Sequence, residues 1–218
     1  MIGVPAGDPP LSTWRRMRLW AAAHAVDDVY QGLVPACVPY FVLDRHYGYV
    51  AASGLTLAAT LGAALPQLVV GFLVDRYSLS WMAGAGVSLA GIGLGMSGVL
   101  HGYALVWMTL FASGLGVAMF HPAAGQAARY AAGDSTSAMS IFATRRQRRV
   151  LPSSGPRGLA APVFGAVAAA HGTQAVLTLL CLLPVPAVAL SLLLPEPISP
   201  SGMCAPPGRS LPRPRLPA

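Results

Sequence analysis

The sequence contains no lysine and has few charged side chains of any kind. Charged residues make up 10% of the 218 residues and the residues AVILMFWYC make up 55%, whereas an ordinary soluble domain has roughly 25% charged residues. The net charge of +7 comes from 14 arginines and seven acidic residues, but the arginines lie between apolar runs and form no basic patch with interleaved aromatic residues. This distribution argues against nucleic-acid binding and favours a membrane protein whose arginines face the cytoplasm.

Cysteine is scarce as well. The three cysteines form no CxxC pair and are odd in number, which argues against a disulfide framework or a thiolate metal site. The HExxH and GxSxG motifs of hydrolases are also absent, which argues against an intramembrane hydrolase. We therefore expect no enzymatic activity, no catalytic residues, no cofactor and no metal ligands.

Apolar runs fill most of the chain, and a bilayer takes roughly 20 apolar residues to cross. They predict an all-α integral membrane bundle over residues 17–195, with a cytoplasmic lead at 1–16 and a disordered, Pro- and Arg-rich tail at 196–218. The expected helices lie at about 17–43, 49–74, 81–100, 103–124, 137–170 (broken) and 173–194. The start of the chain is similar to a signal peptide. Its apolar core is short and meets two aspartates directly, so we read an uncleaved first helix.

The first apolar run, Trp20–Phe41, contains several polar side chains, which are His24, Asp27, Asp28, Tyr30 and Gln31. At helical spacing His24, Asp28 and Gln31 fall on one stripe, and Asp27 lies beside it. A carboxylate at membrane depth costs at least about 2–3 kcal/mol, so it is usually retained for a partner or a translocated ligand. The stripe predicts a substrate or proton pathway. The alternative is that one aspartate only pairs with a buried arginine or a helix dipole.

Glycines dominate the third expected helix. Gly91 and Gly95, and Gly98 and Gly102, are spaced four apart. This spacing lets a neighbouring helix approach closely. A phosphate-binding loop is the weaker interpretation, because no strand precedes these glycines.

The fifth expected helix is interrupted by RRQRR at residues 145–149 and by two prolines before residue 159. Arginine at the bilayer centre costs roughly 2.5–3.5 kcal/mol per residue. We therefore expect residues 145–158 to remain outside the bilayer as a loop and residues 159–170 to form a short helix.

Arginine positions also predict the orientation. With six alternating spans, nearly all arginines fall on one side of the membrane and only Arg45 clearly falls on the other. Both termini are therefore expected in the cytoplasm, with the chain as a multi-pass protein of the cell membrane.

Three stretches resemble a known transporter family. Gly71, Asp75 and Arg76 match the G-x-x-x-D-R loop between the second and third helices of the major facilitator superfamily. HAVDDVYQGLVPACVPY in the first helix and GLGVAMFHPAAGQAAR at the end of the fourth are similar to its fosmidomycin-resistance branch. The resemblance covers about 17–144 and resumes weakly at 159–195. It implies the six-helix N-terminal half of a major facilitator fold, with the fifth helix disrupted.

The resemblance also implies a function, the export of a small molecule in exchange for protons. His24, Asp27, Asp28, Tyr30 and Gln31 would line the substrate and proton pathway, because carboxyl and imidazole groups inside a membrane can take up and release protons. The loop with Gly71, Asp75 and Arg76 would gate the cytoplasmic side. Two further candidates are His121 and Arg129. For His121, a capping or packing role near the membrane face is favoured over contact with the substrate.

Transporters of this family place the substrate between two six-helix halves, and one half is recognisable here. We therefore expect a truncated protein that is inactive alone, with a second half or a second copy, lipid, a small molecule and protons as its partners. One synonymous coding of residues 145–151, read one base later, encodes the family-like Gly-Gly-Asn-Ala-Gly-Phe, which suggests a frameshifted relic. The alternative function is a non-transporting six-helix membrane protein that acts as a structural or assembly partner.

Overall fold

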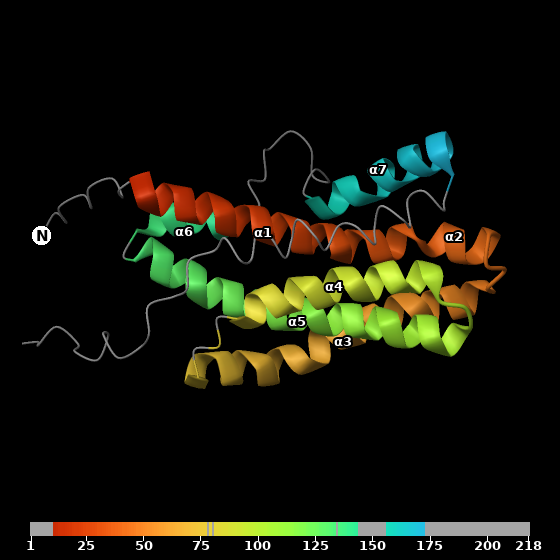
Figure 1. Ribbon diagram of the computed structural model, residues 1–218, viewed down its shortest axis with the longest axis horizontal. Helices are drawn as coiled ribbons and strands as arrows, with labels where there is room; N and C mark the ends of the chain where they lie inside the picture. The colour runs from red at the N-terminus through yellow and green to blue at the C-terminus, as the bar shows by residue number, and fades with distance from the viewer. Residues whose placement is uncertain (1–10, 78, 80, 134, 144–155, 173–218) are drawn as a thin grey trace, which may run out of the picture.

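The computed structural model describes residues 11–77, 79, 81–133, 135–143 and 156–172. Within these ranges the regular structure is entirely α-helical. Figure 1 shows the long helices lying side by side along one direction. The helices are α1 Leu11–Ala36, α2 Val38–Leu43, α3 Tyr49–Tyr77, α4 Trp81–Val99, α5 Tyr103–Ala132, α6 Thr136–Ala143 and α7 Pro156–His171.

Three of these helices, α3, α4 and α5, are long and apolar enough to cross a membrane. Many large apolar side chains on α3 point outward, as expected where lipid replaces water. The exposed ones include Leu57, Leu65, Leu68, Val69 and Phe72. α1 is also long, but its polar side chains lower its hydropathy. The protein is therefore an all-α membrane protein.

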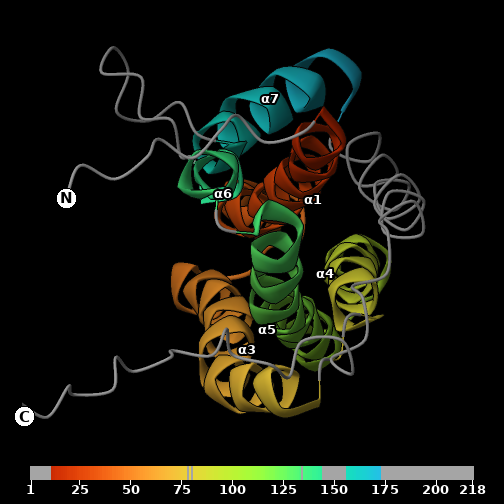
Figure 2. The same cartoon turned by 90° about the vertical axis from the view of Figure 1, so that its left-hand side faces the viewer.

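The centre of the bundle is α5, which Figure 2 shows between α3, α4 and α1. Glycines allow the close approach. A Cβ atom on Gly86 of α4 would lie 2.6 Å from the carbonyl oxygen of Gly116 of α5, and one on Gly93 would lie 2.6 Å from that of Thr109. The sequence predicted a packing face on the glycine-rich helix, but Gly102 is not part of it. Gly102 lies beyond the end of α4 with φ 92° and is the N-cap of α5.

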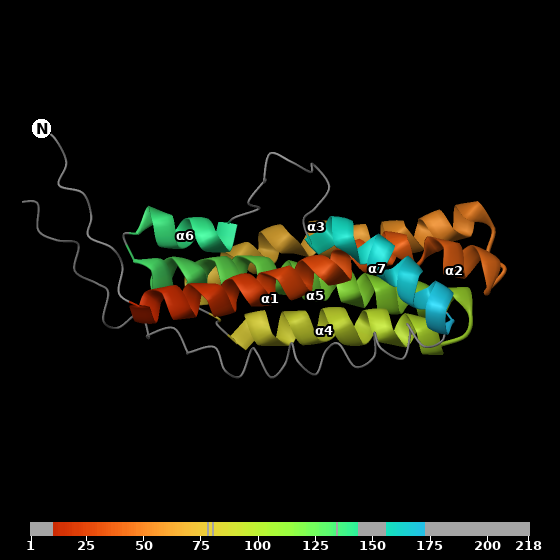
Figure 3. The same ribbon diagram turned by 90° about the horizontal axis from the view of Figure 1, so that it is seen from above.

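The first predicted helix, 17–43, begins earlier and is divided. α1 starts at Leu11, inside the expected lead, and ends at Ala36 before the short helix α2. The division falls between Pro35 and Pro39. Proline has no N–H to donate to the preceding turn, so this pair weakens the helix where it breaks. Figures 1 and 3 show α6 and α7 lying along α1 one after the other.

Two helices extend beyond their predicted C-terminal ends. The expected turn Gly71–Tyr77 is helical and forms the last two turns of α3. Its sequence contains no proline, and Arg76 in the last turn interacts favourably with the helix dipole. The fourth predicted helix continues past 124 to Ala132, where Gly133 ends it with φ 57°. Pro122 is therefore inside a helix and not at its end, a placement that membrane proteins tolerate.

The fifth predicted segment is represented by two helices, α6 and α7. Residues 156–158, expected as loop, form the start of α7, where Pro156 takes a position that suits proline because its missing N–H would have no helical partner. Residues 144–155, with the RRQRR run, lie outside the described residues. The predicted sixth helix at 173–194, the tail at 196–218 and most of the lead lie outside them too.

Figure 1 shows that α1 begins at the same end of the bundle at which α3 and α5 finish. The arginines at that end are Arg15, Arg16 and Arg18 in the first turns of α1, Arg76 in the last turn of α3 and Arg129 in the last turn of α5.

Arg45 lies at the opposite end, after α2. There it donates hydrogen bonds to the Tyr40 hydroxyl at 2.6 Å and to the carbonyl oxygens of Leu100, at 3.0 Å, and Gly98. It thereby fastens α2 to the end of α4.

Candidate functional site

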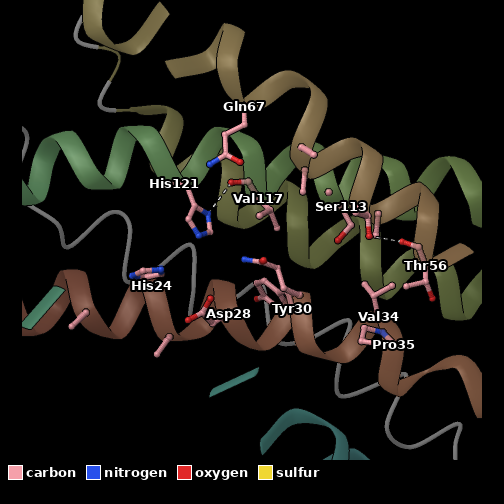
Figure 4. Close-up of a pocket in the computed structure, with 18 of the residues that line it drawn as sticks. His24, Asp28, Tyr30, Val34, Pro35, Thr56, Gln67, Ser113, Val117 and His121 are labelled. Carbon is pink, nitrogen blue, oxygen red and sulfur yellow. Dashed lines mark hydrogen bonds between the residues drawn. The ribbon is translucent and has the colours of Figure 1, made fainter. Parts of the chain in front are cut away.

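A cavity of about 730 Å³ lies between α1, α3, α5 and α6. This volume is in the range of small-molecule sites, roughly 300–1,000 Å³. Most of the lining is apolar, and a few polar side chains point into it, as Figure 4 shows. The polar lining residues are His24, Asp28, Tyr30 and Gln31 of α1, Thr56, Thr60 and Gln67 of α3, and Ser113 and His121 of α5.

Two histidines face each other across the cavity. His24 on α1 and His121 on α5 have ring centroids 5.2 Å apart in an edge-to-face arrangement. His24 Nδ1 lies 3.3 Å from the carbonyl oxygen of Phe142. Phe142 is in the last turn of α6, where carbonyl groups have no partner within the helix. The Phe142 ring also stacks obliquely on His24, with centroids 4.9 Å apart. α6 therefore helps to orient the His24 ring.

The two adjacent aspartates lie in different environments. The Asp27 side chain is 0% exposed. Its Oδ2 accepts a hydrogen bond from Gln31 Nε2 at 3.1 Å and lies 3.3 Å from His121 Nδ1. His121 Nδ1 also lies 3.2 Å from the carbonyl oxygen of Val117. The His121 imidazole is therefore one partner of the buried Asp27 carboxylate.

Asp28, in contrast, lines the cavity. One ring nitrogen each of His24 and His121 and one carboxylate oxygen of Asp28 all lie within 4.8 Å of one another. Figure 4 shows His24 and Asp28 reaching from α1 toward His121 on α5. Tyr30 lines the same cavity, and its buried hydroxyl has no hydrogen-bond partner among the described residues.

A sequence comparison adds a relative. The chain resembles a drug resistance protein. Over 121 residues it is 28% identical to the fosmidomycin resistance protein of Escherichia coli (strain K12), a match that covers 55% of this chain and 30% of that relative. The chain thus spans less than a third of the relative's length in the match. No family model matches the chain. No solved structure matches it either.

The structure does not bring every candidate residue to the cavity. Gly71, Asp75 and Arg76 lie near the end of α3, where Asp75 and Arg76 are exposed and the Arg76 guanidinium lies 5.8 Å from the centre of the Tyr77 ring. Arg129 is exposed in the last turn of α5. These four residues are separate from the cavity lining. His121, expected as a capping or packing residue near a helix end, lies inside α5 and lines the cavity.

Several residues that line the cavity were not predicted from the sequence. Thr56, Thr60 and Gln67 interrupt an apolar run at spacings of four and seven, and the cavity shows that they share one face of α3. The same stripe argument that selected His24 and Asp28 could have found them. Ser113 and Phe142 carry no such signal, because each is a single residue brought to the cavity by helix packing.

Proposed function

We propose that this chain is part of a membrane transporter of the major facilitator superfamily that exports a small molecule in exchange for protons. The observation that carries the proposal is the meeting of His24, Asp28 and His121 in a cavity between apolar helices. Ionisable side chains inside a membrane are expensive and mark substrate or proton pathways. The similarity to a fosmidomycin resistance protein supports the same proposal.

In this proposal Asp28 exchanges protons with the cavity, because its side chain lines the cavity while Asp27 is fully buried. Asp27 positions His121 through the contact at 3.3 Å. Protonation of Asp28 removes one negative charge beside His24 and His121. The affinity of the cavity for a polar substrate then differs between the two protonation states, which is the requirement for coupling a proton to a conformational equilibrium.

The substrate in this proposal is a small molecule with polar groups. The α3 side of the cavity offers the hydroxyls of Thr56 and Thr60 and the amide of Gln67, while alanines of α1 and α3 provide apolar surface between them. Fosmidomycin is the first compound to test, because it appears in the name of the relative.

We further propose that a second six-helix half or a second copy of this chain completes the pathway, with lipid covering the outward apolar side chains of α3. The match to 30% of the relative supports this, and transporters of this superfamily hold their substrate between two halves. Gly71, Asp75, Arg76 and Arg129 would meet the other half at the cytoplasmic end and gate the pathway there.

The test uses inverted membrane vesicles that contain the chain, either alone or together with the part of the relative outside the matched residues. Radiolabelled fosmidomycin should accumulate when the vesicle interior is acidified, in at least one of the two arrangements. Asp28→Asn should lower the rate at least tenfold, whereas Asp44→Asn, an exposed aspartate outside the cavity, should leave it unchanged. Equal accumulation with wild type and Asp28→Asn would contradict the role of Asp28 in proton coupling. No accumulation in either arrangement would favour the non-transporting alternative.

A further inference from the structure

We propose that His24, Asp28 and His121 form a binding site for a divalent first-row transition metal ion such as Zn²⁺. The three side chains offer two imidazole nitrogens and one carboxylate oxygen within 4.8 Å of one another. This inference goes beyond the proposed function, because metal binding does not depend on export.

The tautomer of His24 favours metal binding. Its Nδ1 lies 3.3 Å from the carbonyl oxygen of Phe142. A carbonyl oxygen can only accept a hydrogen bond, so Nδ1 carries the proton. In the neutral ring the lone pair is then on Nε2, which is a metal-binding atom.

His121 has the same arrangement on the facing helix. Its Nδ1 lies 3.2 Å from the Val117 carbonyl oxygen and 3.3 Å from Asp27 Oδ2, and both of these atoms are acceptors. The lone pair of the neutral ring is again on Nε2. A carboxylate or carbonyl that accepts from the second ring nitrogen is the usual outer partner of a metal-binding histidine. Asp27 is itself held by the amide of Gln31 at 3.1 Å.

Asp28 supplies the charge that the two neutral histidines lack. Two imidazoles and one carboxylate, with a further position open to the cavity, form a donor set that divalent zinc and its neighbours accept. Magnesium and calcium prefer sites made of oxygen atoms alone. The ligand atoms of a tetrahedral zinc site lie about 3.3 Å apart, given bonds of roughly 2.0–2.1 Å. The side chains would therefore close by up to about 1.5 Å, which rotation of side chains bordering a cavity can provide.

The experiment is a titration of the purified full-length chain in detergent with Co²⁺ as a spectroscopic probe, followed by displacement with Zn²⁺. We expect one Co²⁺ per chain, with a visible absorption spectrum typical of tetrahedral nitrogen and oxygen ligation, and complete displacement by Zn²⁺. His24→Gln, Asp28→Asn and His121→Gln should each weaken binding at least a hundredfold. Asp27→Asn, which removes the negative charge beside His121 Nδ1, should weaken it about 10–100-fold.

His101→Gln is the matched control, because His101 is exposed and outside the cavity. It should bind within twofold of wild type. Circular dichroism establishes that each variant is helical, and Asp28→Asn, which keeps the side-chain shape, decides the outcome if a histidine variant does not fold. Binding that is absent in wild type, or unchanged in Asp28→Asn, or lost equally in His101→Gln, overturns the proposal.

Discussion

Asp27 and Asp28 show how neighbouring residues of one helix acquire different roles. Adjacent positions of an α-helix point about 100° apart, so the packing of α1 against α5 buries the first carboxylate and leaves the second at the cavity. The stripe of His24, Asp28 and Gln31 could be predicted from spacing, and all three line the cavity. Their contact with His121 could not, because it depends on which helix packs against α1.

The different environments lead to a prediction about stability. Asp27→Ala should lower the free energy of unfolding by about 1–3 kcal/mol, since it removes the carboxylate that accepts from the partly buried Gln31 amide and lies beside His121 Nδ1. Asp28→Ala should change it by less than half as much, because the Asp28 side chain borders a cavity. Unfolding in mixed micelles with increasing SDS, followed by far-UV circular dichroism, measures both. A larger loss for Asp28→Ala would show that the assignment of the two carboxylates is reversed.

At the scale of helices, the lengths of the apolar runs predicted where the helices lie. Polar residues and proline were poor guides to where the helices end. The third predicted helix, 81–100, and α4, Trp81–Val99, differ by one residue. The ends of α3 and α5 were placed too early because Asp75–Arg76 and His121–Pro122 were read as the termini of helices. Polar residues and proline end helices in water more reliably than they do inside a bundle, where packing decides. The contact between α4 and α5 was foreseeable as a glycine face but not in its register.

The register of that face gives the second prediction. Gly86→Ala places a Cβ atom 2.6 Å from the Gly116 carbonyl oxygen and 2.7 Å from the Phe120 nitrogen, so α4 and α5 must separate. Such overpacking costs about 1–3 kcal/mol. Gly71→Ala is the control, because a Cβ atom there meets nothing within 4 Å. It should be neutral or stabilising by up to roughly 1 kcal/mol from helix propensity. The same SDS titration applies, and equal stability of the two variants would rule out the close α4–α5 contact.

A third prediction concerns the connection between α2 and the end of α4. Arg45→Gln removes donors to the Leu100 carbonyl and to the Tyr40 hydroxyl, and hydrogen bonds to charged groups contribute a net of about 1.5–3 kcal/mol each. Arg45 is partly exposed, so we expect a net loss nearer 1 kcal/mol. Proteolysis in the 44–48 connection should become faster in the variant. An unchanged cleavage rate and unchanged unfolding would mean that this connection does not depend on Arg45.

For the whole molecule, composition was sufficient to predict an all-α membrane protein, and the apolar helices with outward-facing side chains confirm it. The cavity was not predictable from any one helix. The cavity requires side chains from α1, α3, α5 and α6 to converge. The polar stripe on α1 indicates only that this face of α1 needs polar groups or water opposite it. The orientation in the membrane is a further property of the whole chain that charge distribution alone predicts.

That orientation is the last prediction. The arginines of α1, α3 and α5 lie at the end where α1 begins and α3 and α5 finish, and Arg45 lies at the other end (Figure 1). Since positively charged residues in short loops at the ends of spans stay in the cytoplasm, reporters inserted after Arg45 and after Gly133 should report opposite sides, with Gly133 in the cytoplasm. Replacing Arg15, Arg16 and Arg18 together with alanine should produce a mixed orientation, because these three charges precede the first span. Arg45→Ala, which removes the opposing charge, should keep or sharpen the wild-type pattern. Alkaline phosphatase and green fluorescent protein fusions read the two sides independently. If both wild-type sites reported the same side, the helices could not alternate across the membrane as the bundle requires.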